Sequence, residues 1–235
     1  MCLKWRTLKI FMDALNRIKF LEDRLHRLSE IGMALSTEKN TDRLFEMILE
    51  EAKAITRADG QTLYSMNKDG NLEFEIMRND TMNIDMGGTS GIEIPYYPVK
   101  LWIDKQTPNK QNVSAYVALA QKTVNIHDAY EEEGFDFEGT KNFDEKSGYR
   151  SKSFLTVPLK NHENEIIGVM QLINARNDHD EVISFNEEMQ EQLESLASQG
   201  AVALTNKRLV EELKTLFEAF IKLIATAIDK KSEYT

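Results

Sequence analysis

Two segments of the sequence gather the side-chain types that recognise small molecules. The first, VNIHDAY at 124–130, runs from an apolar stretch into an Asp and a Tyr. The second, NFDEKSGYRSKSFLTVPL at 142–159, places aromatic, acidic, basic and hydroxyl groups directly before a strand-like run. Loops of this composition at the ends of a sheet are common sites of ligand recognition. An alternative has equal weight, in which the aromatic residues belong to the core and the charged residues form surface ion pairs.

The sequence offers little to catalysis or to a metal ion. Its four histidines lie in different segments, and none has a second His or Cys at ligand spacing; they are His26, His127, His162 and His179. No nucleophile has an evident base, and the common catalytic motifs are absent. The GGTSG run at 87–91 lacks the Lys and Ser/Thr of a phosphate loop, so we expect a mobile turn or lid there. We expect no catalytic residue and no metal ligand.

Composition indicates one globular domain with extensions. The chain has 235 residues, 41% of them hydrophobic, which is enough to bury one sizeable core. A net charge of -10 disfavours binding to nucleic acid or to an anionic membrane. No run approaches the roughly 20 apolar residues that span a bilayer. The single cysteine, Cys2, leaves no internal disulfide and suits a reducing cytosol, so we expect a cytoplasmic protein.

An amphipathic helix is predicted near the start of the chain. Between residues 8 and 35, apolar side chains recur three or four apart with charges between them. Acidic residues interrupt its basic face, so a partner helix suits it better than a membrane surface. A second helix, over 42–57, follows a cap at Asn40 or Thr41.

The middle of the chain, 58–177, has the composition of an antiparallel sheet. Runs rich in β-branched and aromatic residues alternate with turn sequences such as NKDG and NHENE. The predicted elements are strands at Gln61–Ser65, Leu72–Arg78, Phe154–Leu159 and Ile166–Ile173, and a short helix over Val113–Gln121, with loops filling the rest.

A long helix is predicted at the C-terminal end. Ser184, with a Glu three residues later, is a plausible cap, and no helix breaker except Gly200 follows. At 1.5 Å per residue such a helix spans roughly 60 to 70 Å and must leave the domain. Its apolar stripe would then face water, so we expect a homodimer formed through the terminal helices. The predicted interface residues are Leu21, Leu25, Leu28, Leu213, Phe217, Phe220 and Ile224.

Three motifs resemble a known family. KTVNIHDAY, FDEKSGYRSKSFLTVPL and IIGVMQLIN are similar to segments of GAF domains from cyclic nucleotide phosphodiesterases and bacterial sensors, and the resemblance covers residues 28–206. It implies an α+β GAF fold with a central antiparallel sheet of about six strands, terminal helices on one face and ligand-enclosing loops on the other. Combined with the apolar stripes described above, it predicts long N- and C-terminal helices that form a dimer bundle. The residues that would line or close the pocket are Asp128, Tyr130, Phe143, Asp144, Tyr149, Arg150 and Ser153.

Only part of the family's cyclic-nucleotide pattern is present. Members that bind cyclic nucleotides carry an Asn-Lys pair, then a Phe, then an Asp-Glu pair. Asn174 and Phe185 match, whereas Ala175 replaces the Lys and Met189 and Gln190 replace the acidic pair. The Lys–Asp salt bridge of that subclass cannot form. The sequence therefore argues against cyclic AMP or GMP and leaves the pocket open to another small-molecule ligand, with no cofactor expected.

The C-terminal stretch, LFEAFIKLIATAIDKKSEYT at 216–235, resembles the lead-in to an HD-GYP domain. The predicted domains are therefore an amphipathic helix over 1–27, a GAF sensory domain over 28–206 and a signalling helix over 207–235. The signalling helix would lead into a metal-dependent phosphohydrolase that degrades cyclic di-GMP in bacteria. This chain would then be its regulatory, non-enzymatic part.

A second role is also open, in which the GAF domain is degenerate and serves only as a dimerisation scaffold. The two roles differ in what they predict for the interior of the domain. A scaffold predicts an interior without a ligand-sized cavity. A sensor predicts a pocket of roughly 300 Å³ or more.

Overall fold

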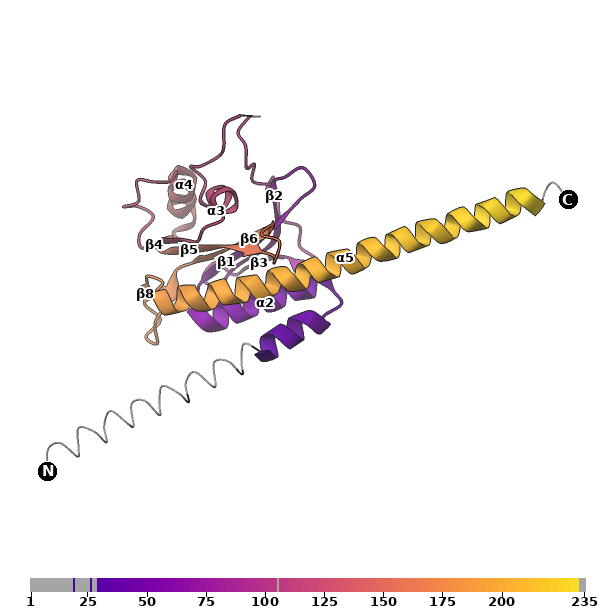
Figure 1. The fold of residues 1–235 in the computed structure, drawn as a ribbon. Coiled ribbons are helices and arrows are strands. Elements are labelled where there is room, and N and C mark those ends of the chain that lie inside the picture. The colour runs from indigo at the N-terminus through magenta and orange to yellow at the C-terminus, as the bar shows by residue number, and fades with distance from the viewer. Residues whose placement is uncertain (1–18, 20–25, 27–28, 105, 233–235) are drawn as a thin grey trace, which may run out of the picture. The chain divides into compact units, whose positions relative to one another are not determined.

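The computed structural model describes residues 19, 26, 29–104 and 106–232, and the chain divides into two compact units, Met1–Glu38 and Lys39–Thr235. In the first unit, residues 29–37 are helical. Most of the helix predicted over 1–27 lies outside the described residues, as do Leu21, Leu25 and Leu28 of the predicted dimer interface. All elements named below belong to the second unit (Figure 1).

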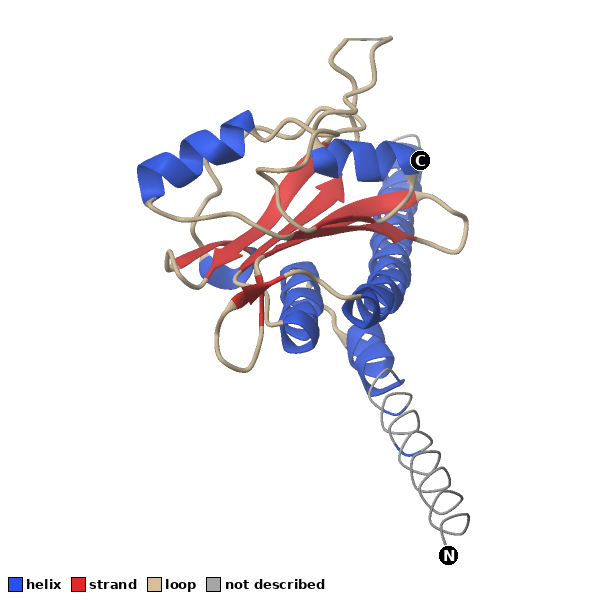
Figure 2. Cartoon of the chain, turned by 90° about the vertical axis from the view of Figure 1, so that its left-hand side faces the viewer, coloured by secondary structure: helices blue, strands red, loops and turns tan. Residues whose placement is uncertain are grey.

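The second unit is built on one antiparallel sheet, whose strands are red in Figure 2. The sheet has six strands in the order β3-β2-β1-β6-β5-β4. Its strands are β1 Gly60–Met66, β2 Leu72–Asn79, β3 Ile84–Gly87, β4 Val124–Ile126, β5 Phe154–Lys160 and β6 Ile166–Ile173. A separate hairpin pairs β7 Ala175–Arg176 with β8 Val182–Ile183. The four predicted strands are confirmed to within one residue at each end. The short edge strands β3 and β4 were not predicted.

Helices cover both faces of the sheet. The helices α2 Thr41–Thr56 and α5 Glu187–Ser232 lie on one face, whereas α3 Val113–Ala120 and α4 Glu138–Ser147 lie on the other (Figure 1). The predicted α+β architecture, with a long C-terminal helix, is confirmed. Successive side chains of each strand point to opposite faces of the sheet, so every strand contributes side chains to both layers.

The helices α2 and α5 pack a hydrophobic core against one face of the sheet. The α2 helix starts at Asn40, whose side chain accepts a hydrogen bond from the Arg43 amide at 3.0 Å, and it buries Leu44, Ile48 and Leu49 completely. Gly200 brings α5 close to α2, because a Cβ there would lie 2.7 Å from the Ile48 Cδ1 atom. Full burial of one such side chain stabilises the fold by roughly 1.5 to 3 kcal/mol.

The start of α5 differs from the prediction. The helix begins at Glu187, and the Asn186 side chain caps it by accepting from the Met189 amide at 2.8 Å. Ser184 was wrong as the cap because β8 ends at Ile183 and the next apolar side chain, Phe185, is buried in the core. The chain turns into the helix only after that anchor.

Two segments predicted as loops are ordered elements. The acidic region contains α4, which has one buried side chain, Asp144, and therefore no apolar stripe for sequence analysis to detect. The GGTSG run forms a short 3₁₀ turn, Gly88–Ser90. Its Thr89 amide and hydroxyl donate to the Glu46 carboxylate of α2 at 3.0 and 2.6 Å. The turn thus lies against α2 and does not form a lid over the opposite face.

The Glu46 carboxylate is a buried anchor for this turn. Burial raises its pKa, but the hydrogen bonds from Thr89 and Arg43 and the positive charge of Arg78 outweigh that effect. The pKa of Glu46 is therefore lowered, and the group is ionised at neutral pH. The α2 helix, the 3₁₀ turn and β2 are held together by one carboxylate.

Gly168 allows β6 to approach β1, and its replacement tests this close contact. A Cβ at Gly168 would lie 2.1 Å from the Tyr64 carbonyl oxygen, which is backbone and cannot move aside. We predict that Gly168→Ala lowers the free energy of unfolding by about 1 to 3 kcal/mol in urea denaturation. Gly139→Ala is the control, because a Cβ at Gly139 meets nothing within 4 Å and Ala favours the helix. Equal stability of the two variants would contradict the packing described.

Candidate functional site

A cavity of about 750 Å³ lies on the face of the sheet that carries α3 and α4. Strands β1, β2, β5 and β6 form its floor. Its roof consists of α4, the segment 149–151 and the segment 109–112 that leads into α3. The cavity exceeds the roughly 300 Å³ expected of a ligand-binding domain.

A polar row crosses the middle of the cavity floor. In the sheet register Thr62 of β1 pairs with Gln171 of β6, which pairs in turn with Thr156 of β5. The Gln171 Nε2 atom donates to the Thr156 hydroxyl at 3.2 Å. Thr156 is fully buried, and Thr62 and Gln171 line the cavity. Thr62 and Gln171 therefore present uncharged polar side chains to the cavity, beside apolar and aromatic side chains of the same strands.

Aromatic side chains form the walls on either side of this row. The rings of Tyr64 and Phe74 lie 4.7 Å apart, and Tyr96 packs against Phe74 at 5.7 Å. Burial raises the pKa of Tyr64 to about 12, so its phenol is neutral at physiological pH. Phe143 of α4 and Phe154 of β5 line the cavity at other points. Flat apolar surfaces thus border the polar row.

Tyr149 joins the roof to the sheet. Its hydroxyl donates to the Asp59 carboxylate at 2.6 Å and accepts from the Asn174 amide at 2.9 Å. Burial and the neighbouring Asp59 carboxylate raise the pKa of Tyr149, so the phenol stays protonated as a donor. Since the Tyr149 ring also lines the cavity, the residue connects the cavity to this hydrogen-bond network.

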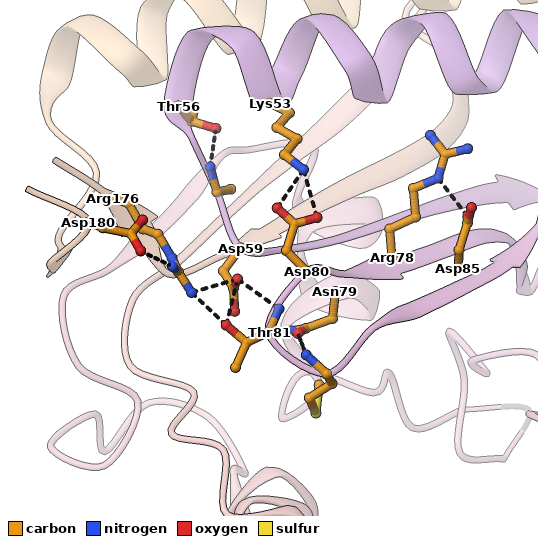
Figure 3. Close-up of polar contacts among 12 residues, drawn as sticks. Lys53, Thr56, Asp59, Arg78, Asn79, Asp80, Thr81, Asp85, Arg176 and Asp180 are labelled. Atoms are coloured by element: carbon orange, nitrogen blue, oxygen red, sulfur yellow. Dashed lines mark hydrogen bonds and ion pairs between the residues drawn. The ribbon is translucent and has the colours of Figure 1, made fainter. Parts of the chain in front are cut away.

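Asp59 is the centre of the network, and its side chain is 1% exposed. The carboxylate also pairs with Arg176 of β7 at 2.7 Å and accepts from the Thr81 hydroxyl at 2.9 Å (Figure 3). Arg176 pairs in addition with Asp180 in the β7–β8 turn. The network thus ties the start of β1, the β2–β3 turn and the β7–β8 hairpin to the roof.

Asn174 fixes the segment that follows Tyr149. Its side-chain oxygen accepts from the amides of Lys152 and Ser153 at 2.7 and 3.2 Å, and its amide donates to the Arg150 carbonyl at 2.8 Å. Asn174 is buried and has a positive φ of 58°, a conformation that Asn tolerates better than most residues. The Asn of the partial cyclic-nucleotide pattern therefore has a structural role here.

The seven predicted ligand-binding residues fall into three places. Phe143 and Tyr149 line the cavity. Ser153 lies at the start of β5, where its hydroxyl donates to the Ile183 carbonyl at 2.7 Å. The other four form a cluster beside the roof, outside the lining of the cavity; they are Asp128, Tyr130, Asp144 and Arg150. Their role in ligand binding stays a prediction.

This cluster braces the roof. The Arg150 guanidinium stacks on the Tyr130 ring at 3.4 Å and pairs with Asp128 at 2.8 Å. The Tyr130 hydroxyl donates to Asp144 of α4 at 3.1 Å, and Asp144 also accepts from the Ser151 amide and hydroxyl. The connection after β4 is thereby fastened to α4 and to the segment before β5.

The residues that contribute polar groups to the cavity and to the Asp59 network were not predicted from the sequence. Gln171 is the one polar side chain in the apolar strand β6, which is a signal that marked it, whereas Thr62 lies in β1 together with the polar residues Gln61 and Ser65. Asp59 and Arg176 meet across 117 residues of sequence, and no local pattern predicts such a pair.

The four predicted dimer-interface residues of α5 are exposed. Leu213, Phe217, Phe220 and Ile224 follow the last buried turn of α5, and the exposed fraction of Phe217 is 64%. No element among the described residues covers them. Their predicted role in a dimer stays a prediction.

Within 29–104 and 106–232, together with residues 19 and 26, no group of three or more His, Cys, Asp or Glu side chains is arranged to hold a metal ion. In the same range, no helix is long and apolar enough to cross a membrane.

Residues 40–204 match the family model described as GAF domain. The chain is 31% identical over 130 residues to the dual 3',5'-cyclic-AMP and -GMP phosphodiesterase 11A of Takifugu rubripes. That match covers 55% of this chain but only 14% of the phosphodiesterase, so the chain spans a small part of its curated relative.

Solved structures share the fold. The GAF domain of a phosphoenolpyruvate-protein phosphotransferase from Coxiella burnetii has a TM-score of 0.56 at 14% identity, with 80% of this chain and 96% of that chain covered. The corresponding domain from Acinetobacter has a TM-score of 0.53 at 15% identity and the same coverage. Identities this low establish a common fold only.

Removal of the Asp59 carboxylate tests the buried network. We predict that Asp59→Ala lowers the free energy of unfolding by about 3 to 5 kcal/mol, because Arg176 is left without its buried partner. Asp178→Ala is the control, since its pair with Arg57 is exposed and should contribute less than about 1 kcal/mol. Urea denaturation of both variants measures the difference. A loss of stability in Asp59→Ala no larger than that in the control would show that the network is not structural.

Proposed function

Because this chain belongs to the GAF domain family, we propose that it binds a small molecule in its cavity and regulates an output domain joined to α5. GAF domains are small-molecule-sensing regulatory domains that occur in phosphodiesterases and other signalling proteins, and in this proposal the domain regulates and does not catalyse. The observation that carries the proposal is the cavity of about 750 Å³ with its aromatic walls and polar floor.

The proposed output domain is a bacterial HD-GYP phosphohydrolase that degrades cyclic di-GMP in the cytoplasm. The support is the resemblance of 216–235 to the lead-in of such domains. The curated relative is also a phosphodiesterase, and most of its length lies outside the match to this chain. In this proposal a rigid helix links the cavity-bearing domain to the output domain, and ligand binding biases the packing of that helix.

The proposed route of the signal is a homodimer formed through the terminal helices. Nine large apolar side chains of α5 are exposed within sixteen residues; they are Leu209, Val210, Leu213, Leu216, Phe217, Phe220, Ile221, Leu223 and Ile224. Their three- and four-residue spacing forms a continuous stripe. A second copy of the helix would cover this stripe. Leu21, Leu25 and Leu28 of the N-terminal segment complete the proposed interface.

The cavity favours a role of the domain as a ligand sensor over a role as a dimerisation scaffold alone. A domain that serves only to dimerise needs a filled interior, since a void deprives its lining of packing contacts. The cavity here lies between a well-packed sheet and a roof that is fixed by hydrogen bonds from the Tyr149 hydroxyl to Asp59 and from the Ser151 amide to Asp144. Such a fixed, open volume suits a ligand.

Native mass spectrometry of the chain purified from cells tests the sensor proposal. We predict a small bound mass that is lost under denaturing conditions. Thr140→Trp should reduce the bound fraction, because Thr140 lines the cavity and the larger side chain occupies its space. Lys146→Trp places the same bulk on an exposed position of α4 and should leave the bound fraction unchanged. A wild-type chain without any bound mass would contradict the sensor and favour the scaffold.

Charge substitution on the α5 stripe tests the dimer. We predict that Phe217→Glu combined with Phe220→Glu converts a dimer to a monomer in sedimentation velocity, because the buried interface would then contain unpaired carboxylates. The matched control is Thr215→Glu, which adds a carboxylate to the opposite side of the helix, so the dimer should persist. A dimer that survives the double substitution would contradict this interface.

A further inference from the structure

The cavity presents no free positive charge to a ligand. Among the described residues of its lining, Arg78 and Asp136 are the charged ones. The Arg78 guanidinium points toward α2 (Figure 3), and it donates to Asp85 of β3 at 2.8 Å and to Glu46 of α2 at 3.3 Å. Both of its partners are carboxylates. Arg78 is therefore already neutralised.

Two further groups, the Asp136 carboxylate and the first turn of α3, also disfavour the binding of an anion. One Asp136 carboxylate oxygen accepts from the Glu138 amide at 2.9 Å, and the carboxylate adds negative charge to the lining. The first turn of α3 is capped by Asn112, whose side chain accepts from the Ala115 amide at 3.0 Å. A phosphate in the cavity would meet a carboxylate and an occupied cap, with no unpaired cation in the lining to offset the loss of its hydration.

The polar groups left for a ligand are neutral. The Thr62 hydroxyl makes no hydrogen bond with any described residue, and the Gln171 Oε1 atom has no partner there either, because only Nε2 is engaged with Thr156. Both residues line the cavity floor. Together they offer one acceptor oxygen and one hydroxyl that can donate or accept. A buried site that contains such groups strongly prefers a ligand that pairs with them.

The walls favour a flat ligand. Tyr64 and Phe74 border the polar row on one side, and Phe154 lies in the adjacent row of the sheet on the other. Aromatic side chains stack on the π-face of a heterocyclic ring. A planar ring placed between these side chains would direct its polar edge to the row of Thr62 and Gln171.

We propose that the cavity binds an uncharged planar heterocycle with donors and acceptors on its edge, a nucleobase or nucleoside without a phosphate. Thr62 and Gln171 select it by hydrogen bonds to that edge. This inference rests on the proposed sensory function and narrows its ligand to one chemical class. It distinguishes the site from one that would hold a cyclic nucleotide by its phosphate.

Matched ligand pairs test the proposal. The full chain is unfolded, dialysed and refolded to remove any bound molecule, and titrated calorimetrically with guanosine and adenosine and with cyclic GMP and cyclic AMP. Each pair shares a base and differs by the charged phosphate. We expect at least one nucleoside to bind about tenfold or more tightly than its cyclic nucleotide. Equal or tighter binding of the cyclic nucleotides would overturn the ligand class while leaving the sensor intact.

Variants test the role of Gln171. Gln171→Leu removes the acceptor at similar volume and should weaken nucleoside binding by about tenfold or more. The control is Gln192→Leu, which makes the same change on α5 far from the cavity lining. Unchanged nucleoside affinity in Gln171→Leu would overturn the assigned contact.

The experiments distinguish an error in the proposed ligand class from an error in the proposed sensory function. If the chain carries a bound mass from cells but binds neither nucleoside, the sensory function is supported and the proposed ligand class is wrong. A chain that carries no bound mass contradicts the sensory function, and one that in addition binds none of the four probes contradicts the ligand class as well.

Discussion

The buried carboxylate of Asp59 is the interaction on which the arrangement of the site depends. A charge taken out of water costs several kcal/mol unless it is paired and hydrogen-bonded, and Asp59 obtains partners from Arg176, Thr81 and Tyr149. These partners come from three connections that the sheet alone would leave free. By satisfying one charge, the chain fixes the β7–β8 hairpin and the roof of the cavity at the same end of the sheet.

Helices and strands that bury apolar side chains were predictable from the sequence. Elements that are held in place by polar contacts were not. Strands β5 and β6 have dense apolar composition because both of their faces are covered, and their predicted ends are close to the observed ones. In contrast, α4 buries only Asp144, so its sequence has no helical apolar period. The start of α5 was misplaced because Phe185 is an anchor in the core, which only the tertiary structure shows.

The same distinction applies to the site. Phe143 and Tyr149 lie in the cavity lining, as aromatic residues in a loop before a strand suggested, whereas Asp128 and Arg150 pair with each other beside it. Thr62 and Gln171 become neighbours through the pairing of β1 with β6, so their row is visible only once the register is known. The hydrogen bond from Tyr149 to Asp59 joins residues 90 positions apart. No local pattern in the sequence predicts a contact between residues so far apart.

Our central proposal is that the cavity binds a ligand and that this binding changes the packing of α5. Amide hydrogen exchange of the protein as isolated from cells and again after its ligand is removed by unfolding and refolding tests this claim most directly. We predict that removal accelerates exchange in the roof, residues 136–151, and in the part of α5 that packs on the sheet, residues 187–205. Identical exchange in both segments before and after removal would contradict the claim.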